Sequence, residues 1–206
     1  IGGRIHSINT HDMGPSWIWP HHHKMLQLVN DYKLELFEQY TNGLALYDHP
    51  SGVQKFNAPP QGSSYRVVGG ISALSSAIFR TLSQVTLHLD AEVKAITKEE
   101  NSFSIQTQRK AFNCDYIIST LPPRVAVDTI SYSPDLPLQQ KMLMQTIPTW
   151  MGGSAKCVIE YKEAFWRDSG LSGFVFSPLG PLGEIHDACT KDTTALFGFV
   201  QNDANL

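Results

Sequence analysis

The spacing of apolar and polar residues along the chain predicts several helices. Met25, Leu26 and Val29 share one face of a helix that begins near His22 and ends at residue 30 or 31. A second helix over residues 71–82 is predicted by four apolar residues at three- and four-residue spacing, namely Ile71, Leu74, Ile78 and Leu82. Pro123 suits the first turn of a short helix over residues 123–130, and residues 138–147 are also expected to be helical.

Shorter segments with apolar residues at every second position predict strands. Thr41-Asn42-Gly43 is a strong turn signal, so residues 34–40 and 44–47 are expected to pair as a hairpin, and a second turn at 50–52 leads into 53–56. Residues 57–64 are predicted to form a linker. The remaining expected strands are 85–89, 92–97, 103–108 and 116–120, followed by four strands of a second sheet at 153–161, 173–176, 184–188 and 195–200.

This order of elements predicts a fold of mixed class, in which an α/β half and an α+β half are interleaved along the chain. The 206 residues are 42% hydrophobic and 17% charged, which is ordinary globular composition with a real core. The net charge of −3 argues against a nucleic-acid partner. No apolar run reaches the roughly 18–20 residues that span a membrane. Three widely spaced cysteines, without a C-x-x-C pair, indicate reduced thiols and a cytoplasmic protein.

Several short motifs, in their order along the chain, resemble the flavin-containing amine oxidases, which include monoamine and polyamine oxidases and their bacterial relatives. None of these motifs is specific alone, but together they extend over nearly the whole chain. They are Gly2-Gly3-Arg4, Asp12-x-Gly14-x-x-Trp17, Val68-Gly69-Gly70, Leu87-His88-Leu89-x-x-x-Val93-x-x-Ile96, the strand 116–122 that ends at Pro122, the run 153–167 that contains Lys156 and Phe165-Trp166-Arg167, and the later Gly173 and Leu196-Phe197-Gly198-Phe199.

The resemblance implies a partial FAD-binding domain, Rossmann-like and three-layered, formed by residues 1–33 and 65–130. Interleaved with it is a mixed-sheet substrate-binding domain of residues 34–64 and 131–206. The family's Gly-x-Gly-x-x-Gly unit and its C-terminal FAD segment are absent from these 206 residues. The chain is therefore expected to be an internal fragment that binds FAD weakly or not at all. The short distance from Trp17 to Gly69 is expected of a compact, bacterial member.

The resemblance assigns a catalytic role to Lys156, which would hold a water near the flavin N5. The competing interpretation is a lysine that extends its charged end from a strand into solvent. The same resemblance predicts that seven residues contact the cofactor, namely Gly2, Gly3, Arg4, Gly14, Trp17, Val93 and Pro122. Simpler interpretations stay open for four of them: a surface arginine at Arg4, a core tryptophan at Trp17, an ordinary strand valine at Val93 and a helix start at Pro122. No metal is expected, because the side chains of residues 21–23, three consecutive histidines, diverge.

The implied reaction is the oxidation of a C–N bond of a small-molecule amine to an imine, after which O2 reoxidises FAD and yields H2O2. Two alternatives remain at this point: a related flavin desaturase or dehydrogenase, and a non-catalytic scaffold module. Lys156 favours the amine oxidase.

Overall fold

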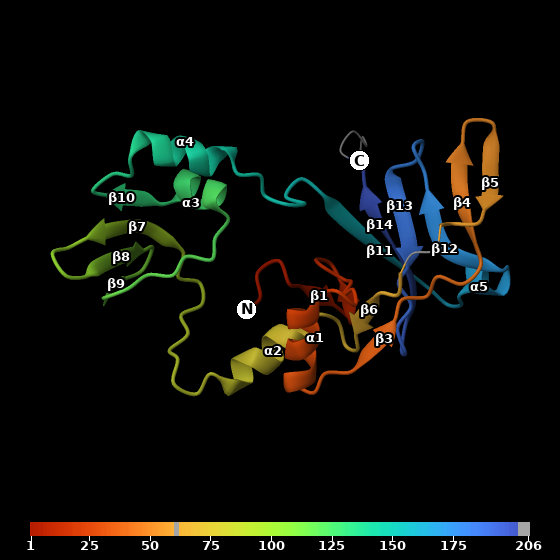
Figure 1. Ribbon diagram of the computed structural model, residues 1–206, viewed down its shortest axis with the longest axis horizontal. Helices are drawn as coiled ribbons and strands as arrows, with labels where there is room; N and C mark the ends of the chain where they lie inside the picture. The colour runs from red at the N-terminus through yellow and green to blue at the C-terminus, as the bar shows by residue number, and fades with distance from the viewer. Residues whose placement is uncertain (60–61, 202–206) are drawn as a thin grey trace. The chain divides into compact units, whose positions relative to one another are not determined.

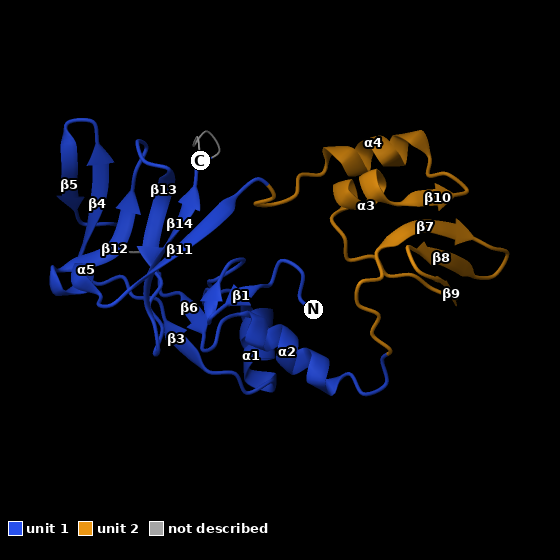
Figure 2. Cartoon of the chain, turned by 180° about the vertical axis from the view of Figure 1, so that it is seen from behind, with its two compact units in different colours: residues 1–85, 153–206 blue, residues 86–152 orange. Residues whose placement is uncertain are grey.

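The computed structural model describes residues 1–59 and 62–201. The chain forms two compact units, one from residues 1–85 and 153–206 and the other from residues 86–152 (Figure 2). Lys156 and the glycine-rich N-terminal segment belong to the first unit. Pro60 and Gln61, in the middle of the predicted linker, lie outside the described residues.

Around the two longer helices of the first unit lies a small apolar core. The predicted helices are confirmed as α1 (His23–Asp31) and α2 (Ser72–Thr81). Beside them, β3 (Leu36–Glu38) pairs antiparallel with β6 (Tyr65–Val67), and β1 (Ser7–Ile8) pairs with β2 (His11–Asp12). The buried members of the core are Val29 of α1, Val67 of β6, Ile71 at the N-cap of α2, and Ile18, which forms an isolated bridge with Tyr65. Burial of this apolar face stabilises helices too short to persist alone.

The larger part of the first unit is a six-stranded sheet, which confirms the predicted second sheet (Figure 1). All neighbours are antiparallel except β12 and β4, which are parallel. A short helix, α5 (Phe165–Asp168), joins β11 to β12. In spatial order the strands are β11 (Ala155–Tyr161), β14 (Thr194–Val200), β13 (Leu182–Asp187), β12 (Leu171–Phe176), β4 (Leu44–His49) and β5 (Gly52–Phe56).

The hairpin predicted between residues 34–40 and 44–47 is wrong, because the two segments join different sheets. β3 pairs with β6, whereas β4 pairs with β5 and β12. The backbone passes from one sheet to the other at Gly43, whose φ is +105° and whose added Cβ would lie 2.5 Å from the carbonyl oxygen of Gly170. The turn signal was therefore real, but it redirects the chain instead of closing a hairpin. The following hairpin, β4–β5, is confirmed.

The second unit has a four-stranded sheet and two helices. Its strands lie in the order β10 (Ser131–Ser133), β7 (Val93–Lys98), β8 (Phe103–Thr107) and β9 (Ala111–Cys114). The strands β7 and β8 confirm two predictions, whereas β9 and β10 were not predicted from the sequence. The predicted helices are confirmed as α3 (Pro123–Thr129) and α4 (Leu138–Thr146), each preceded by a proline N-cap.

Two predicted strands, residues 85–89 and 116–120, are wrong, because neither segment is a strand in the structure. Their apolar side chains are largely exposed: 57% for Val85, 59% for Leu89, 88% for Tyr116 and 91% for Ile118. An alternating pattern becomes a strand only when a neighbour supplies hydrogen bonds, and no neighbouring strand is found for either segment among the described residues.

The mixed fold class is confirmed by this architecture. The proposed division into FAD-binding and substrate-binding domains concerns ligands, so the compact units do not test it and it stays a prediction. Among the described helices, none has the length and apolar character to cross a membrane. The three cysteines are free thiols.

Candidate active site

Lys156 projects from β11 onto one face of the six-stranded sheet, where residues 12–16 cover it. Its Nζ donates to the carbonyl oxygens of Asp12 (3.0 Å) and Gly14 (2.8 Å) and to the Ser16 Oγ (2.7 Å). The same nitrogen lies 4.3 Å from the centre of the Phe197 ring, within cation–π distance. An ammonium has three donors, so these contacts use all of them. The alternative of a lysine extending into solvent is therefore wrong.

Burial changes the acidity of this lysine. The pKa of Lys156 is lowered from 10.5 to about 8, chiefly because desolvation penalises the charged form, while nearby Asp12 opposes the shift and Arg66 adds to it. Near pH 8 the amine thus gains or loses a proton with a small change in pH. Such a group is suited to general acid–base work.

Asp12 fixes the loop that covers Lys156. Its Oδ1 accepts hydrogen bonds from the Ser7 Oγ (2.8 Å) and from the backbone N–H of Ile71 (2.6 Å), so it joins the β1–β2 turn to the start of α2. Its Oδ2 is buried without a hydrogen-bond partner among the described residues. Burial raises the pKa of the Asp12 carboxyl above its usual value. The two hydrogen bonds and the positive charge of Arg66 oppose this rise without cancelling it. Gly70, at φ +85°, leaves the room that this carboxylate needs.

Two of the three predicted cofactor-binding glycines, Gly2 and Gly3, have left-handed backbone. Gly2 and Gly3 have φ of +96° and +55°, and a Cβ on Gly3 would meet no atom within 4 Å. Gly14 lies directly against the chain, since a Cβ there would lie 1.9 Å from the carbonyl oxygen of Arg4. Arg4 itself is exposed. Open left-handed backbone beside a permanent cation fits a large anionic cofactor such as a flavin dinucleotide.

Trp17 belongs to an aromatic cluster beside Lys156. Its Nε1 donates to the Gln39 Oε1 (3.0 Å), and its ring meets those of His186 and Phe197 at centroid distances of 4.8 and 5.3 Å. The core interpretation of this tryptophan therefore has direct support. Its role toward a cofactor stays a prediction.

Val93 and Pro122 lie in the second unit, which is described by itself. Val93 begins β7 opposite Thr107, and Pro122 is the N-cap of α3 with its carbonyl accepting from Ala126 (3.0 Å). Both therefore have ordinary structural roles, and their predicted contacts with a cofactor stay predictions. Within residues 1–59 and 62–201, no group of histidine, cysteine and carboxylate side chains is arranged to hold a metal.

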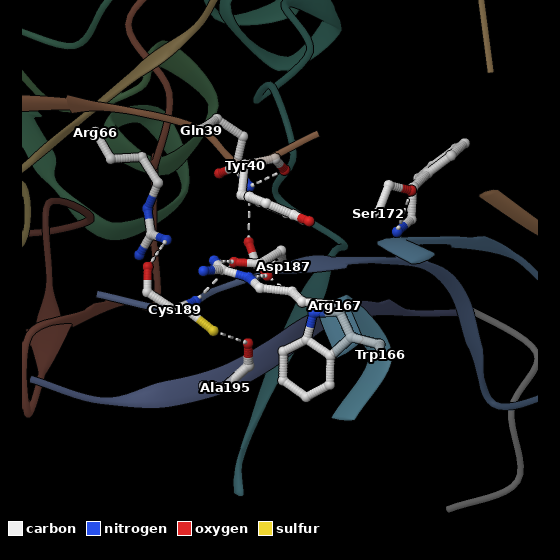
Figure 3. A network of polar contacts seen from close by, with 10 residues as sticks. Gln39, Tyr40, Arg66, Trp166, Arg167, Ser172, Asp187, Cys189 and Ala195 are labelled. Atoms are coloured by element: carbon white, nitrogen blue, oxygen red, sulfur yellow. Dashed lines mark hydrogen bonds and ion pairs between the residues drawn. The ribbon is translucent and has the colours of Figure 1, made fainter. Parts of the chain in front are cut away.

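A buried ion pair on the first unit was missed by the sequence analysis (Figure 3). The Asp187 carboxylate accepts two hydrogen bonds from Arg167, both 2.7 Å, one from the Trp166 Nε1 (2.9 Å) and one from the backbone N–H of Cys189 (2.9 Å). This hydrogen bonding raises the pKa of Arg167. Asp187 thereby holds α5 and the β13–β14 turn together. Separations of 20 and 21 residues leave no local signal from which the contact could have been predicted.

An open cleft of about 510 Å³ lies elsewhere on the first unit, between β3 and the β13–β14 turn. Its lining includes Glu35, Tyr40, Arg167 and Lys191, and none of the predicted site residues.

The shifted pKa of Lys156 predicts how stability depends on pH. Between about pH 8 and 10.5 the unfolded chain still binds a proton that the folded chain has released, so the free energy of unfolding rises with pH in this window. The expected gain, relative to Lys156→Met, is on the order of 2–3 kcal/mol. Urea unfolding of both proteins near pH 8 and near pH 10.5 measures it, and other titrating groups cancel in the difference. A constant difference across the window would contradict the burial of this ammonium.

Comparison with known sequences links most of the chain to one family. The family model described as Flavin containing amine oxidoreductase matches residues 53–203. A probable flavin-containing monoamine oxidase A of Dictyostelium discoideum is 31% identical over 142 residues, which are 68% of this chain and 30% of that protein. The flavin-containing amine oxidase A of Bos taurus is 30% identical over 150 residues, which are 70% of this chain and 28% of that protein. The chain thus spans less than a third of the length of these relatives.

Solved structures share the fold at lower sequence identity. A putrescine oxidase matches 98% of this chain and 68% of its own with a TM-score of 0.79 at 17% identity. The cyclohexylamine oxidase of Brevibacterium oxydans matches 92% of this chain and 64% of its own with a TM-score of 0.76 at 14% identity. The predicted mixed fold class therefore agrees with these solved structures.

Proposed function

Because this chain belongs to the family of flavin-containing amine oxidoreductases, we propose that the protein containing it oxidises a C–N bond of an amine to an imine with FAD. O2 then accepts the electrons and yields H2O2. The observation that carries the proposal is the position of Lys156: a lysine with a pKa of about 8, held by three hydrogen bonds on an aromatic sheet face. A buried lysine of this kind favours amine oxidation over the alternative of a flavin desaturase.

Seven residues are proposed to contact the cofactor, namely Gly2, Gly3, Arg4, Gly14, Trp17, Val93 and Pro122. In the first unit, Gly3 offers open left-handed backbone and Arg4 a cation, whereas Gly2 and Gly14 lie against carbonyl oxygens of the chain itself, and Trp17 offers an aromatic ring. In the second, Val93 and Pro122 are proposed to contact the cofactor through the backbone. These assignments accompany the proposed domains, residues 1–33 and 65–130 for FAD and residues 34–64 and 131–206 for the substrate.

Bound FAD would supply the redox chemistry by accepting a hydride equivalent from the carbon next to the amine. The residues of this chain would orient the amine and transfer protons. The Nζ of Lys156 can hold a water through one N–H, or exchange a proton with it, when one of its three protein contacts yields. The ring of Phe197 and the loop 12–16 keep bulk solvent from this nitrogen.

Three further properties are proposed. No Gly-x-Gly-x-x-Gly motif occurs in the 206 residues, which supports weak FAD binding, or none, by this chain alone. The three free thiols support a reducing compartment such as the cytoplasm, and the short segment between Trp17 and Gly69 supports a compact bacterial type of enzyme.

The proposed function is tested on the full-length gene product by absorption spectroscopy. We expect a yellow protein whose flavin bands bleach when an amine is added without oxygen and return, with release of H2O2, when oxygen is admitted. A full-length protein that stays colourless after incubation with FAD, or whose flavin no amine bleaches, would contradict the proposal.

A further inference from the structure

A second contact joins β11 to the loop that covers Lys156. The imidazole Nε2 of His11, the first residue of β2, lies 3.1 Å from the Oε1 of Glu160 on β11. Alternate residues of a strand point to one face, so Glu160 lies on the same face as Lys156, roughly 13 Å further along β11. The segment 11–16 therefore contacts β11 at both ends, through His11 at one and through the acceptors of Lys156 at the other.

His11 is almost fully buried, and only one of its ring nitrogens has a partner. The residue is 3% exposed, and its Nδ1 is buried without a hydrogen-bond partner among the described residues. A carboxylate only accepts hydrogen bonds, so the ring must donate from Nε2 to Glu160, and Nδ1 is left unpaired in either protonation state. The unpaired nitrogen offsets much of what the bond to Glu160 contributes to folding. The pair thus adds little net stability and mainly fixes the loop to β11.

The position of this loop decides the surroundings of the Lys156 amine. The carbonyl oxygens of Asp12 and Gly14 can accept from it only while the loop lies on β11. The same loop keeps water from the nitrogen, and desolvation is the main cause of the lowered pKa of Lys156. The charged groups that act on this amine, Asp12 on β2 and Arg66 on β6, have opposite effects on its pKa. The cover that the loop provides is therefore what keeps the pKa low.

We propose that His11 is a positioning residue for Lys156, and that its contact with Glu160 is a clamp that holds the loop 12–16 closed over the amine. The kinetic consequence of this clamp rests on the proposed function, whereas the clamp itself does not. Without the clamp the loop opens from its His11 end, water reaches Lys156, and the amine becomes more basic. His11 acts through the loop and not on the reacting atoms.

The test measures the pKa of Lys156 in the full-length protein. Competitive labelling of the lysines with acetic anhydride at a series of pH values, read by peptide mass spectrometry, gives this pKa with the exposed Lys162 as internal reference. His11→Leu, which keeps apolar bulk but has no donor, is expected to raise the pKa by about half a unit or more from its value near 8. His11→Gln places a donor nitrogen at the same number of bonds from the backbone and should stay close to wild type. General damage to the fold would not produce that rescue.

Glu160→Ala breaks the same contact from the other side. The Glu160 side chain is 53% exposed, so this variant is expected to fold. Removal of an anion would by itself lower the pKa of a nearby lysine. An upward shift in Glu160→Ala, like that in His11→Leu, can therefore come only from the opened loop. The matched control is Glu163→Gln, which removes an exposed acid beyond the end of β11 and should leave the pKa of Lys156 unchanged.

Kinetics of the FAD-loaded protein give a second readout. The inflection near pH 8 that is expected for the flavin reaction should move upward by the same amount in His11→Leu and Glu160→Ala. If Lys156 keeps the wild-type pKa in Glu160→Ala, or if His11→Gln shifts it as far as His11→Leu does, the clamp is overturned. Glu160→Ala decides alone if His11→Leu does not fold. If no amine bleaches the wild type, the proposed function fails, and the labelling still decides the clamp.

Discussion

Replacing Lys156 by methionine is expected to lower amine-dependent turnover of the full-length protein by about 100-fold or more, the usual contribution of a positioned acid or base. Methionine is one atom shorter than lysine and suits the ring of Phe197, but it can neither hold a water nor exchange a proton. Stopped-flow absorbance should separate two steps: bleaching of the flavin by amine without oxygen, and recovery of its colour with oxygen. The pH dependence of the affected step should also lose its inflection near pH 8.

The control for this variant is Lys162→Met, six residues further along, which removes an exposed lysine beyond the end of β11. It should leave both steps unchanged. If Lys156→Met bleached and recovered at wild-type rates with its flavin bound, Lys156 would have only a structural role, and the observation that carries the proposed function would be lost.

Replacing Asp187 by alanine is expected to lower the free energy of unfolding by about 3–5 kcal/mol, the cost of removing one partner of a buried ion pair. Asp187 has a side chain only 1% exposed, and it accepts four hydrogen bonds. Its loss leaves the Trp166 Nε1 and the Cys189 N–H without acceptors in a place that water reaches poorly. Arg167 can partly compensate, because its side chain is 31% exposed.

Urea unfolding at neutral pH measures this cost. Asp192→Ala, in the adjoining turn and exposed, serves as the matched control and should change stability by less than about 0.5 kcal/mol. A loss below about 1 kcal/mol in Asp187→Ala would show that the pair contributes no more than a surface ion pair.

Only part of the candidate site could be predicted from the sequence. Lys156 was singled out from its local run of residues, yet nothing local could show that its amine reaches the carbonyl of Asp12, 144 residues away. The contacts of Ser16 with Lys156 and of Asp12 with Ile71 could not be predicted locally, because their partners lie 140 and 59 residues away. The contact between Glu184 and His186 could be predicted locally, because residues two apart on a strand share a face.

The amino-acid sequence by itself determined the four longer helices, most of the strands and the family resemblance. These depend on periodicity, on proline and glycine at element ends and on the order of short motifs, all of which are properties of neighbouring residues. Only the tertiary structure decided which strands pair. The turn at Gly43 sends β3 and β4 to different sheets, and the segments 85–89 and 116–120 do not become strands in spite of their alternation. Strand pairing, burial and the pKa of Lys156 depend on atoms brought together from distant segments, so their free energies cannot be assigned to any one stretch of chain.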